Sequence, residues 1–160
     1  MLKSRWSVGL VMLIVGAVAG WFAYSIVANA RSVSASSKVY DIVKQQQEAW
    51  NRGDLDGFLS HYDMSEDITF YSDDKVSKGW VALNDRYRRR YGGGAAAMGQ
   101  LAFDELSTVR LTEDAVLMQG RWTTNGTPNA GTGLFTILIR KTDNGWKIVH
   151  DHTSAKKAAE

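Results

Sequence analysis

Residues 145–154, GWKIVHDHTS, decide most about the fold and chemistry of this 160-residue chain. The first half of the stretch is rich in strand-forming apolar residues. The second half places one acid, two imidazoles and two hydroxyls in five consecutive positions. Side chains alternate between the two faces of a strand, which predicts two groups: Trp146, Ile148, His150 and His152 on one face, and Lys147, Val149, Asp151 and Thr153 on the other. Ionisable groups on a strand that is otherwise apolar suggest a pocket.

The segments that precede this stretch predict an α+β fold. Three strand-like segments come before it, separated by turn-forming residues, and Asp143-Asn144-Gly145 is a strong hairpin signal. These strands, with the last one, are expected at residues 101–111, 115–124, 133–141 and 146–153. The first half of the chain has helical periodicity from Lys38 to a C-cap at Gly53, a short helix capped by Asp54, a short strand at 68–71 and a third helix at 79–91. Helices followed by antiparallel strands predict a curved antiparallel sheet with the helices gathered on one face.

The amino-terminal segment is apolar enough for a membrane. Residues 8–27 carry no charge, follow the basic Lys3 and Arg5, and reach the length of roughly 20 residues that a bilayer-spanning helix needs. Two interpretations remain open, a retained anchor and a signal peptide cleaved near Ala30, and the span length favours the anchor. Both place the rest of the chain outside the cytoplasm.

Charge and cysteine content exclude several functions. The net charge of +2 comes from Lys3 and Arg5, so the rest of the chain balances 17 basic against 17 acidic residues and gives no electrostatic case for nucleic acid. Without cysteine the chain has no thiol catalysis, disulfide or thiolate-bound zinc. The sequence therefore predicts four parts: a signal or anchor segment (1–30), a linker (31–37), one domain (38–154) and a polar tail (155–160).

Several motifs resemble the nuclear transport factor 2-like superfamily, and within it the SnoaL-like and SgcJ/EcaC-type domains. They are the segment from Gln47 to Asp54, residues 67–71, Gly79 before the third helix and the terminal GWKIVHDHTS. The terminal segment also resembles the association domain of calcium/calmodulin-dependent protein kinase II. The resemblance covers about residues 38–154. It implies a cone-shaped fold, in which a bent sheet wraps around the long first helix and leaves a pocket at the open end.

The resemblance also implies one pocket residue. Laying the association domain on this chain aligns one of its pocket arginines with Arg121, whereas two others fall on Ile137 and Thr153, where this chain has no arginine. The aspartate and oxyanion-hole set of the ketosteroid isomerase branch does not map residue by residue.

Arg121 and Asp151 are accordingly the candidate catalytic pair. If both face the interior, Arg121 can hold an anionic or carbonyl oxygen while Asp151 acts as a base or an orienting group. The alternative is a purely structural ion pair.

Further residues are expected around the same pocket. They add aromatic walls, a hydroxyl and an imidazole to the pair: Thr153, Tyr71, Trp80, Tyr87, Tyr91 and His152. The structural alternative is that the aromatic residues simply form core. His150 and His152 have a spacing that can ligate a metal, but the sequence supplies no further ligands beside them, so neither a metal nor another cofactor is expected.

The sequence predicts that this is a domain that binds an unknown small molecule. The alternative is a cofactor-free lyase or isomerase that moves a proton next to a carbonyl, with Asp151 as the base. A homodimer is also expected, because the strand at 133–141 is apolar on both faces, and a dimeric assembly module for a membrane partner is the third possibility.

Overall fold

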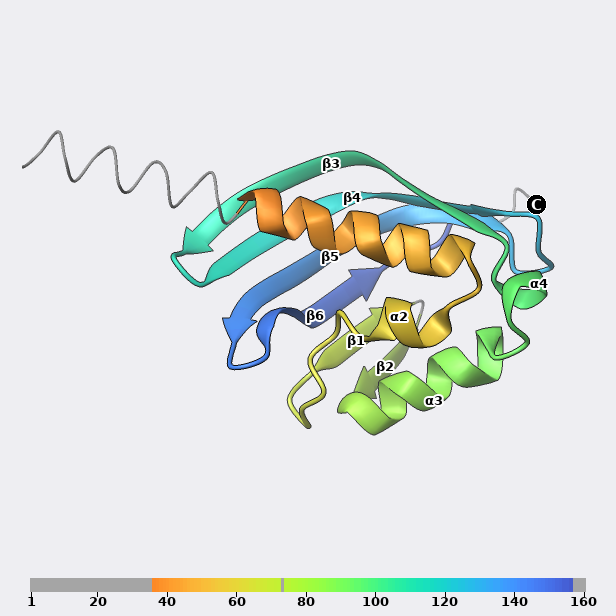
Figure 1. Ribbon diagram of the computed structural model, residues 1–160, viewed down its shortest axis with the longest axis horizontal. Helices are drawn as coiled ribbons and strands as arrows, with labels where there is room; N and C mark the ends of the chain where they lie inside the picture. Colours follow the sequence, from red (N-terminus) through yellow and green to blue (C-terminus); the bar gives the residue numbers. More distant parts are fainter. Residues whose placement is uncertain (1–35, 73, 157–160) are drawn as a thin grey trace, which may run out of the picture. The chain divides into compact units, whose positions relative to one another are not determined.

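The computed structural model describes residues 36–72 and 74–156, which form an α+β fold. The first helix covers residues 36–51 and is followed by α2 (Leu55–Leu59), β1 (Thr69–Ser72), β2 (Lys75–Lys78), α3 (Trp80–Tyr91), α4 (Ala95–Met98), β3 (Gln100–Thr112), β4 (Ala115–Asn125), β5 (Gly131–Thr142) and β6 (Gly145–Thr153). The six strands form one curved sheet in the order β2-β1-β6-β5-β4-β3, and Figure 1 shows the long strands β3 to β5 running alongside one another. The expected α+β class and curved sheet are confirmed.

The helices begin and end where the sequence places caps. Gly53 adopts a φ of 75°, which glycine reaches without steric cost, and so closes the first helix. One carboxylate oxygen of Asp54 accepts a hydrogen bond of 2.8 Å from the Gly57 amide and caps α2. Both predicted caps are confirmed.

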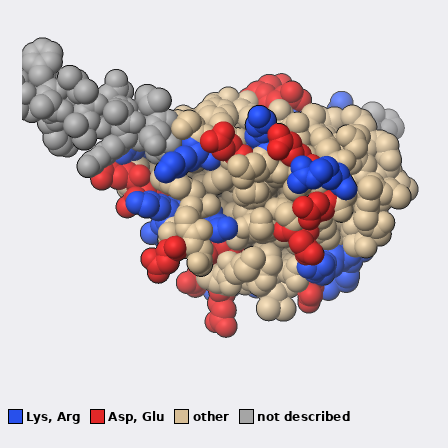
Figure 2. Space-filling view, viewed as in Figure 1, with Lys and Arg blue, Asp and Glu red and all other residues tan. Residues whose placement is uncertain are grey.

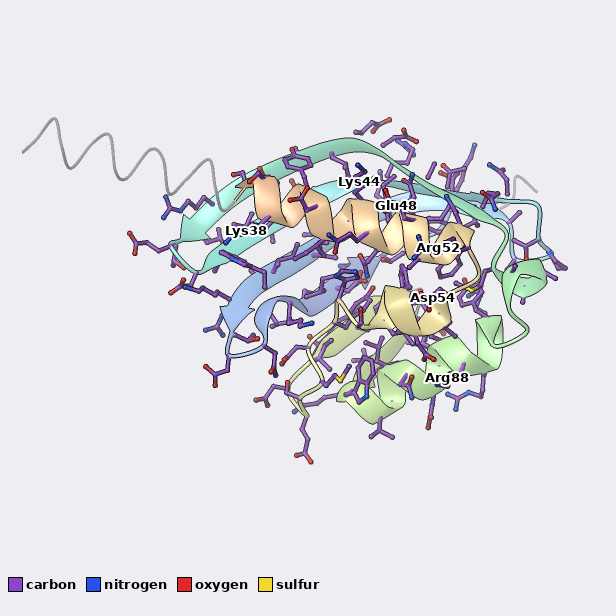
Figure 3. All side chains as sticks on the ribbon, viewed as in Figure 1. Lys38, Lys44, Glu48, Arg52, Asp54 and Arg88 are labelled. Atoms are coloured by element: carbon purple, nitrogen blue, oxygen red, sulfur yellow. The ribbon has the colours of Figure 1, made fainter. Side chains whose placement is uncertain are left out.

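The first helix supplies the centre of the core. Its buried residues recur at three- and four-residue steps and face the sheet: Val39, Ile42, Val43, Gln46, Ala49 and Trp50. The other side of the helix carries Lys44 and Glu48, which form an exposed i, i+4 pair (Figure 3). The helix is also joined to β3, because the Gln47 side chain accepts from the Phe103 amide at 2.9 Å.

Two features of the sheet differ from the sequence prediction. β1 pairs with β6 in parallel, whereas the other strand pairs are antiparallel as expected. β1 and β6 lie side by side although most of the domain separates them in the sequence. A connection of that length can return the chain in the same direction, as a parallel pair requires. The elements β2 and α4 were not predicted from the sequence. Both are only four residues long, too short to show a periodicity.

Among residues 36–72 and 74–156, no helix has the length and apolar character to cross a bilayer. The predicted span at 8–27 lies outside the described residues. Figure 2 shows basic and acidic side chains interspersed over one face of the molecule, in line with the balanced charge of the sequence.

Candidate functional site

A cavity of about 140 Å³ lies between the first helix, α2, α3 and the inner face of the sheet. Its walls are mainly apolar and aromatic, with contributions from Trp50, Phe58, Phe70, Phe103, Trp122, Phe135 and Ile137. Ten of the 21 lining residues carry a polar or ionisable group: Gln46, Tyr62, Ser72, Arg86, Tyr87, Arg90, Tyr91, Thr124, Asp151 and Thr153. A concave apolar site with a few convergent polar groups is the usual form of a small-molecule site.

Asp151 reaches the cavity through an irregularity in β6. The register between β5 and β6 shifts at Leu138 and Ile139, so that Val149 is an extra residue without a partner in the ladder. This β-bulge breaks the alternation, and Ile148 and Asp151 both face the interior. The predicted alternation along β6 is therefore wrong at Ile148, although Asp151 and Thr153 face the cavity as expected.

Tyr62 is brought to Asp151 by a short pairing next to this bulge. The Ile148 amide donates to the His61 carbonyl oxygen and the Asp63 amide donates to the Ile148 carbonyl oxygen, each at 2.9 Å. These bonds hold Tyr62 against β6. Tyr62 was not predicted as a site residue, because Ile148, the residue that positions it, is distant in the sequence.

Asp151 accepts two short hydrogen bonds from hydroxyl groups. The Tyr62 hydroxyl donates to Oδ2 at 2.7 Å and the Thr153 hydroxyl donates to Oδ1 at 2.8 Å. The Tyr62 hydroxyl also lies 3.4 Å from the Tyr87 hydroxyl. The result is a chain of polar groups, Tyr87, Tyr62, Asp151 and Thr153, along one wall of a mainly apolar cavity.

Burial shifts the pKa values of the ionisable side chains in this row of polar groups. Asp151 is only 5% exposed, and its partners on the neighbouring strands are Phe70 and Ile137, so desolvation raises its pKa to about 6 against the opposing effect of the two hydrogen bonds. Burial and then the nearby carboxylate also raise the pKa of Tyr62 and of Tyr87. Both phenols therefore stay protonated at neutral pH and can donate hydrogen bonds, while Asp151 titrates close to neutrality.

Helix α3 contributes part of the cavity wall. Tyr87 and Tyr91 are four residues apart and both line it, as the sequence predicted. Trp80 is not among the lining residues. It is half-buried against the core at the start of α3, seven residues and about 10 Å of helix before Tyr87. The prediction that Trp80 forms part of the pocket wall is wrong for this reason.

Arg121 lies on the other face of the sheet. The inward residues of β4 are Val116, Met118 and Thr124, and Arg121 is out of phase with them. Its guanidinium group binds the carboxylate of Glu105, with Nε 3.0 Å from Oε1, and does not line the cavity. The predicted meeting of Arg121 with Asp151 is therefore wrong. The inward placement came from the resemblance to the association domain, and the strand's own pattern did not correct it because Val116, Leu117 and Met118 are all apolar.

Replacing Arg121 with glutamine is accordingly expected to leave ligand affinity and the thermal unfolding midpoint unchanged. The reason is that exposed ion pairs contribute little to stability and that this one lies outside the cavity. Ligand titration and thermal melting of the variant beside the unmodified protein check this. A clear loss of affinity in Arg121→Gln would restore Arg121 to the site.

The other predicted residues of this region also face outward. Tyr71 is 41% exposed because strand alternation turns it away from the cavity that Phe70 and Ser72 line. Its ring lies beside those of His150 and His152. His150 Nδ1 is 2.6 Å from the Thr69 hydroxyl, and burial lowers its pKa. Tyr71 and His152 are thus not cavity residues. Within residues 36–72 and 74–156, no three His, Asp or Glu side chains gather as a metal site would require.

Residues 39–157 match the family model of the SnoaL-like domain, and the chain belongs to this family. A nuclear transport factor 2-like protein of unknown function from Shewanella oneidensis is 32% identical, with a TM-score of 0.69 over 75% of this chain and 98% of that one. The resemblance read from the sequence is confirmed.

More distant structures share the fold. A candidate dehydratase of the nuclear transport factor 2-like family from Streptomyces avermitilis is 18% identical, with a TM-score of 0.65 over 79% of this chain and 99% of that one. A candidate scytalone dehydratase from Novosphingobium aromaticivorans is 10% identical, with a TM-score of 0.65 over 81% and 89% of the two chains. No curated protein shows significant similarity to the chain.

Proposed function

We propose that this domain binds a small organic molecule of about one ring in the cavity between α3 and the sheet. The observation that carries the proposal is a hollow interior, lined by many apolar and aromatic side chains, with the carboxyl–hydroxyl cluster of Asp151, Tyr62 and Thr153 on its wall. A solid core of the same residues would be more stable, because closely packed interiors keep few voids larger than water. The void therefore points to an occupant.

The size of the cavity limits the ligand. A cavity of about 140 Å³ is close to the roughly 150 Å³ that accommodates one benzene molecule in another protein. The walls favour an apolar or aromatic body, since the lining rings offer edge and face contacts. The Asp151 cluster favours a ligand hydroxyl, because a carboxylate only accepts hydrogen bonds and has lone pairs beyond the two that Tyr62 and Thr153 use.

Filling or covering the cavity is expected to abolish binding. Val43→Phe adds a ring from the first helix at a buried lining position, and Ala155→Trp places an indole at an exposed one. A ligand-observed NMR screen with one-ring compounds should show hits with the unmodified protein and at least tenfold weaker binding with either variant. Because Ala155 is exposed, Ala155→Trp keeps the test valid if Val43→Phe destabilises the fold. Hits that persist unchanged in both variants would place binding elsewhere and overturn the proposal.

A second function is favoured by the protonation of Asp151. A carboxyl group with a pKa of about 6 is close to the optimum for a general base at neutral pH. In this alternative, Asp151 removes a proton from the carbon next to a ligand carbonyl, and the Tyr87 hydroxyl donates to the carbonyl oxygen. The comparisons with candidate dehydratases are compatible with such proton transfer.

A deuterium-exchange experiment distinguishes the enzymatic function from the binding function. Incubating the protein with acetophenone in D₂O should speed exchange at the methyl carbon if Asp151 is a base, and Asp151→Asn should lower that rate by about 10² or more. If acetophenone binds but deuterium exchange at its methyl carbon is not accelerated, the enzymatic function is excluded and only the binding function remains. Direct NMR titration of Asp151 gives the pKa independently.

We also propose that the domain acts outside the cytoplasm, tethered by residues 8–27, and that it is a homodimer. The support for the tether is the basic start and apolar span of the sequence. The support for the dimer is Leu134, which is 53% exposed on the outer face of β5. Amino-terminal sequencing of the protein recovered from membranes tests the tether, with a start near Arg31 counting against it. Light scattering that shows a monomer at micromolar concentrations would exclude the dimer.

A further inference from the structure

The first helix carries three consecutive glutamines with different surroundings. Gln45 is exposed, and the Gln47 side chain accepts a hydrogen bond from the Phe103 amide. Gln46 lies on the buried face of the helix, is only 3% exposed and lines the cavity. An amide buried among apolar side chains costs free energy unless its polar atoms have hydrogen-bond partners. The partners of the Gln46 amide therefore decide whether its role is purely structural.

One half of the Gln46 amide has a structural partner. Its Nε2 donates to the Phe58 carbonyl oxygen at 3.3 Å, in the last turn of α2, where carbonyl groups lack partners within the helix. A carbonyl oxygen only accepts hydrogen bonds, so this bond fixes which end of the amide is the nitrogen. The position of Oε1 is fixed with it, and the bond to Phe58 gives that oxygen no partner.

The amide oxygen of Gln46 is open to the cavity. Among residues 36–72 and 74–156, no donor forms a hydrogen bond with Oε1. Within the same residues, every side-chain nitrogen or oxygen atom that is fully enclosed has a partner, so Oε1 keeps some accessible surface. Because Gln46 is buried and lines the cavity, that surface faces the cavity. Oε1 is therefore an acceptor that a ligand can reach.

Several donors of the lining are already used within the protein. The hydroxyl groups of Tyr62 and Thr153 donate to the two oxygens of Asp151. The remaining hydroxyl and indole donors with known acceptors bind backbone carbonyl oxygens, and they belong to Thr124, Trp50 and Trp122. The carboxylate of Asp151 keeps lone pairs that these bonds do not use. A ligand that contacts both Asp151 and Gln46 therefore has to supply a hydrogen-bond donor to each.

We propose, on the basis of the proposed function, that Gln46 is a second ligand-binding residue and that the ligand is a one-ring compound with two hydroxyl groups. One hydroxyl group donates to Asp151 and the other donates to Oε1 of Gln46. Phe58 links the two acceptors, because its carbonyl oxygen binds Gln46 and its ring centre lies 5.9 Å from that of Tyr62. The ligand ring lies against Phe58, with one hydroxyl group toward the first helix and one toward β6.

Resorcinol and hydroquinone, compared with 3-fluorophenol and 4-fluorophenol, provide the test. Fluorine is close in size to a hydroxyl group but cannot donate a hydrogen bond, so the members of each pair differ by one donor. Each compound is titrated into the full-length protein by calorimetry at pH 7.5, above the pKa of Asp151, which burial raises to about 6. One or both dihydroxybenzenes should bind more tightly than the matching fluorophenol by about fivefold or more.

Methionine variants on the first helix locate the second hydrogen bond. Gln46→Met keeps the length of the side chain and removes the amide. It should lower the affinity for the dihydroxybenzene about fivefold, to that of the matching fluorophenol, and leave the fluorophenol affinity unchanged. Gln45→Met is the matched control, since it makes the same change at the neighbouring exposed position outside the cavity and should alter neither affinity.

NMR of the unmodified protein gives a readout that does not depend on the folding of Gln46→Met. A carbonyl group that accepts a hydrogen bond has a deshielded carbon. The Cδ signal of Gln46 should therefore move downfield with the preferred dihydroxybenzene and stay close to its unliganded position with the matching fluorophenol. The Cδ signal of the exposed Gln45 should stay in place with both compounds.

Failure of this inference and failure of the proposed function give different results. If the members of both pairs bind equally, if the preference for the dihydroxybenzene persists in Gln46→Met, or if the Gln46 Cδ signal does not move at saturation, the role of Gln46 is wrong while binding in the cavity stands. The same holds if none of the four compounds binds while the wider screen of one-ring compounds finds other ligands. If that screen also finds no ligand, the proposed function fails, and the inference fails with it.

Discussion

Replacing Asp151 with asparagine is expected to stabilise the folded domain relative to the unmodified protein by about 2 kcal/mol more at pH 8 than at pH 4. Asp151 is buried, and its pKa rises from 3.8 to about 6 on folding. The folded state therefore binds more protons than the unfolded state between these pH values. Stability that is fully present below pH 3.8 is lost as the pH rises through about 6, and asparagine, which does not ionise, avoids that loss.

Urea unfolding of both proteins between pH 4 and pH 8 measures this difference. Taking the difference between the two proteins at each pH cancels the titration of the other carboxyl groups. The hydrogen bonds that asparagine changes add a constant offset, so the slope with pH is the diagnostic quantity. A difference that stays flat across this range would show that the carboxyl group is not penalised by burial.

Replacing Trp50 with alanine is expected to destabilise the domain by about 4 kcal/mol. Trp50 is 3% exposed and packs edge-on against Phe58 and Tyr91, with ring centres 4.9 and 4.7 Å away. Its indole N–H also donates to the Met98 carbonyl oxygen at 2.8 Å. The substitution therefore removes a large side chain from the cavity wall and leaves that carbonyl without its indole donor.

Chemical denaturation compares this variant with Trp80→Ala. Trp80 is half-buried, so the same substitution there is expected to cost less than half as much. Equal losses at the two positions would mean that Trp50 does not organise the interior. Trp50→Phe refines the result, because it keeps an aromatic ring and loses only the bond to Met98.

Local signals in the chain predicted much of the fold. Patterns within about ten residues predict the first helix, the Gly53 and Asp54 caps and the long strands. Over that distance, backbone propensity and side-chain periodicity determine the type of secondary structure. The short helix α4 lacked such a signal. Residues 92–99 are rich in glycine and alanine, and α4 depends on the burial of Met98 and on its bond to Trp50, a distant residue.

The candidate site was predicted only in part, and the reason differs from residue to residue. Asp151, Thr153, Tyr87 and Tyr91 line the cavity as expected. Arg121 does not, because its inward placement rested on the resemblance to the association domain, and an apolar run on β4 conceals which face is buried. Arg86 and Arg90 also line the cavity, where their guanidinium groups lie over the rings of Phe70 and Tyr91, and neither was predicted as a site residue.

The amino-acid sequence by itself determined the SnoaL-like class, the order of the elements other than β2 and α4, and the presence of an acid on the last strand. The tertiary structure alone decided that Asp151 and Ile148 share the inner face, through a bulge at Val149, and that Tyr62 reaches the carboxylate through a backbone pairing with Ile148. Periodicity specifies a side of a regular element. It cannot specify an added residue in a ladder or a partner that is far away along the chain, since both depend on how strands meet after the chain has folded.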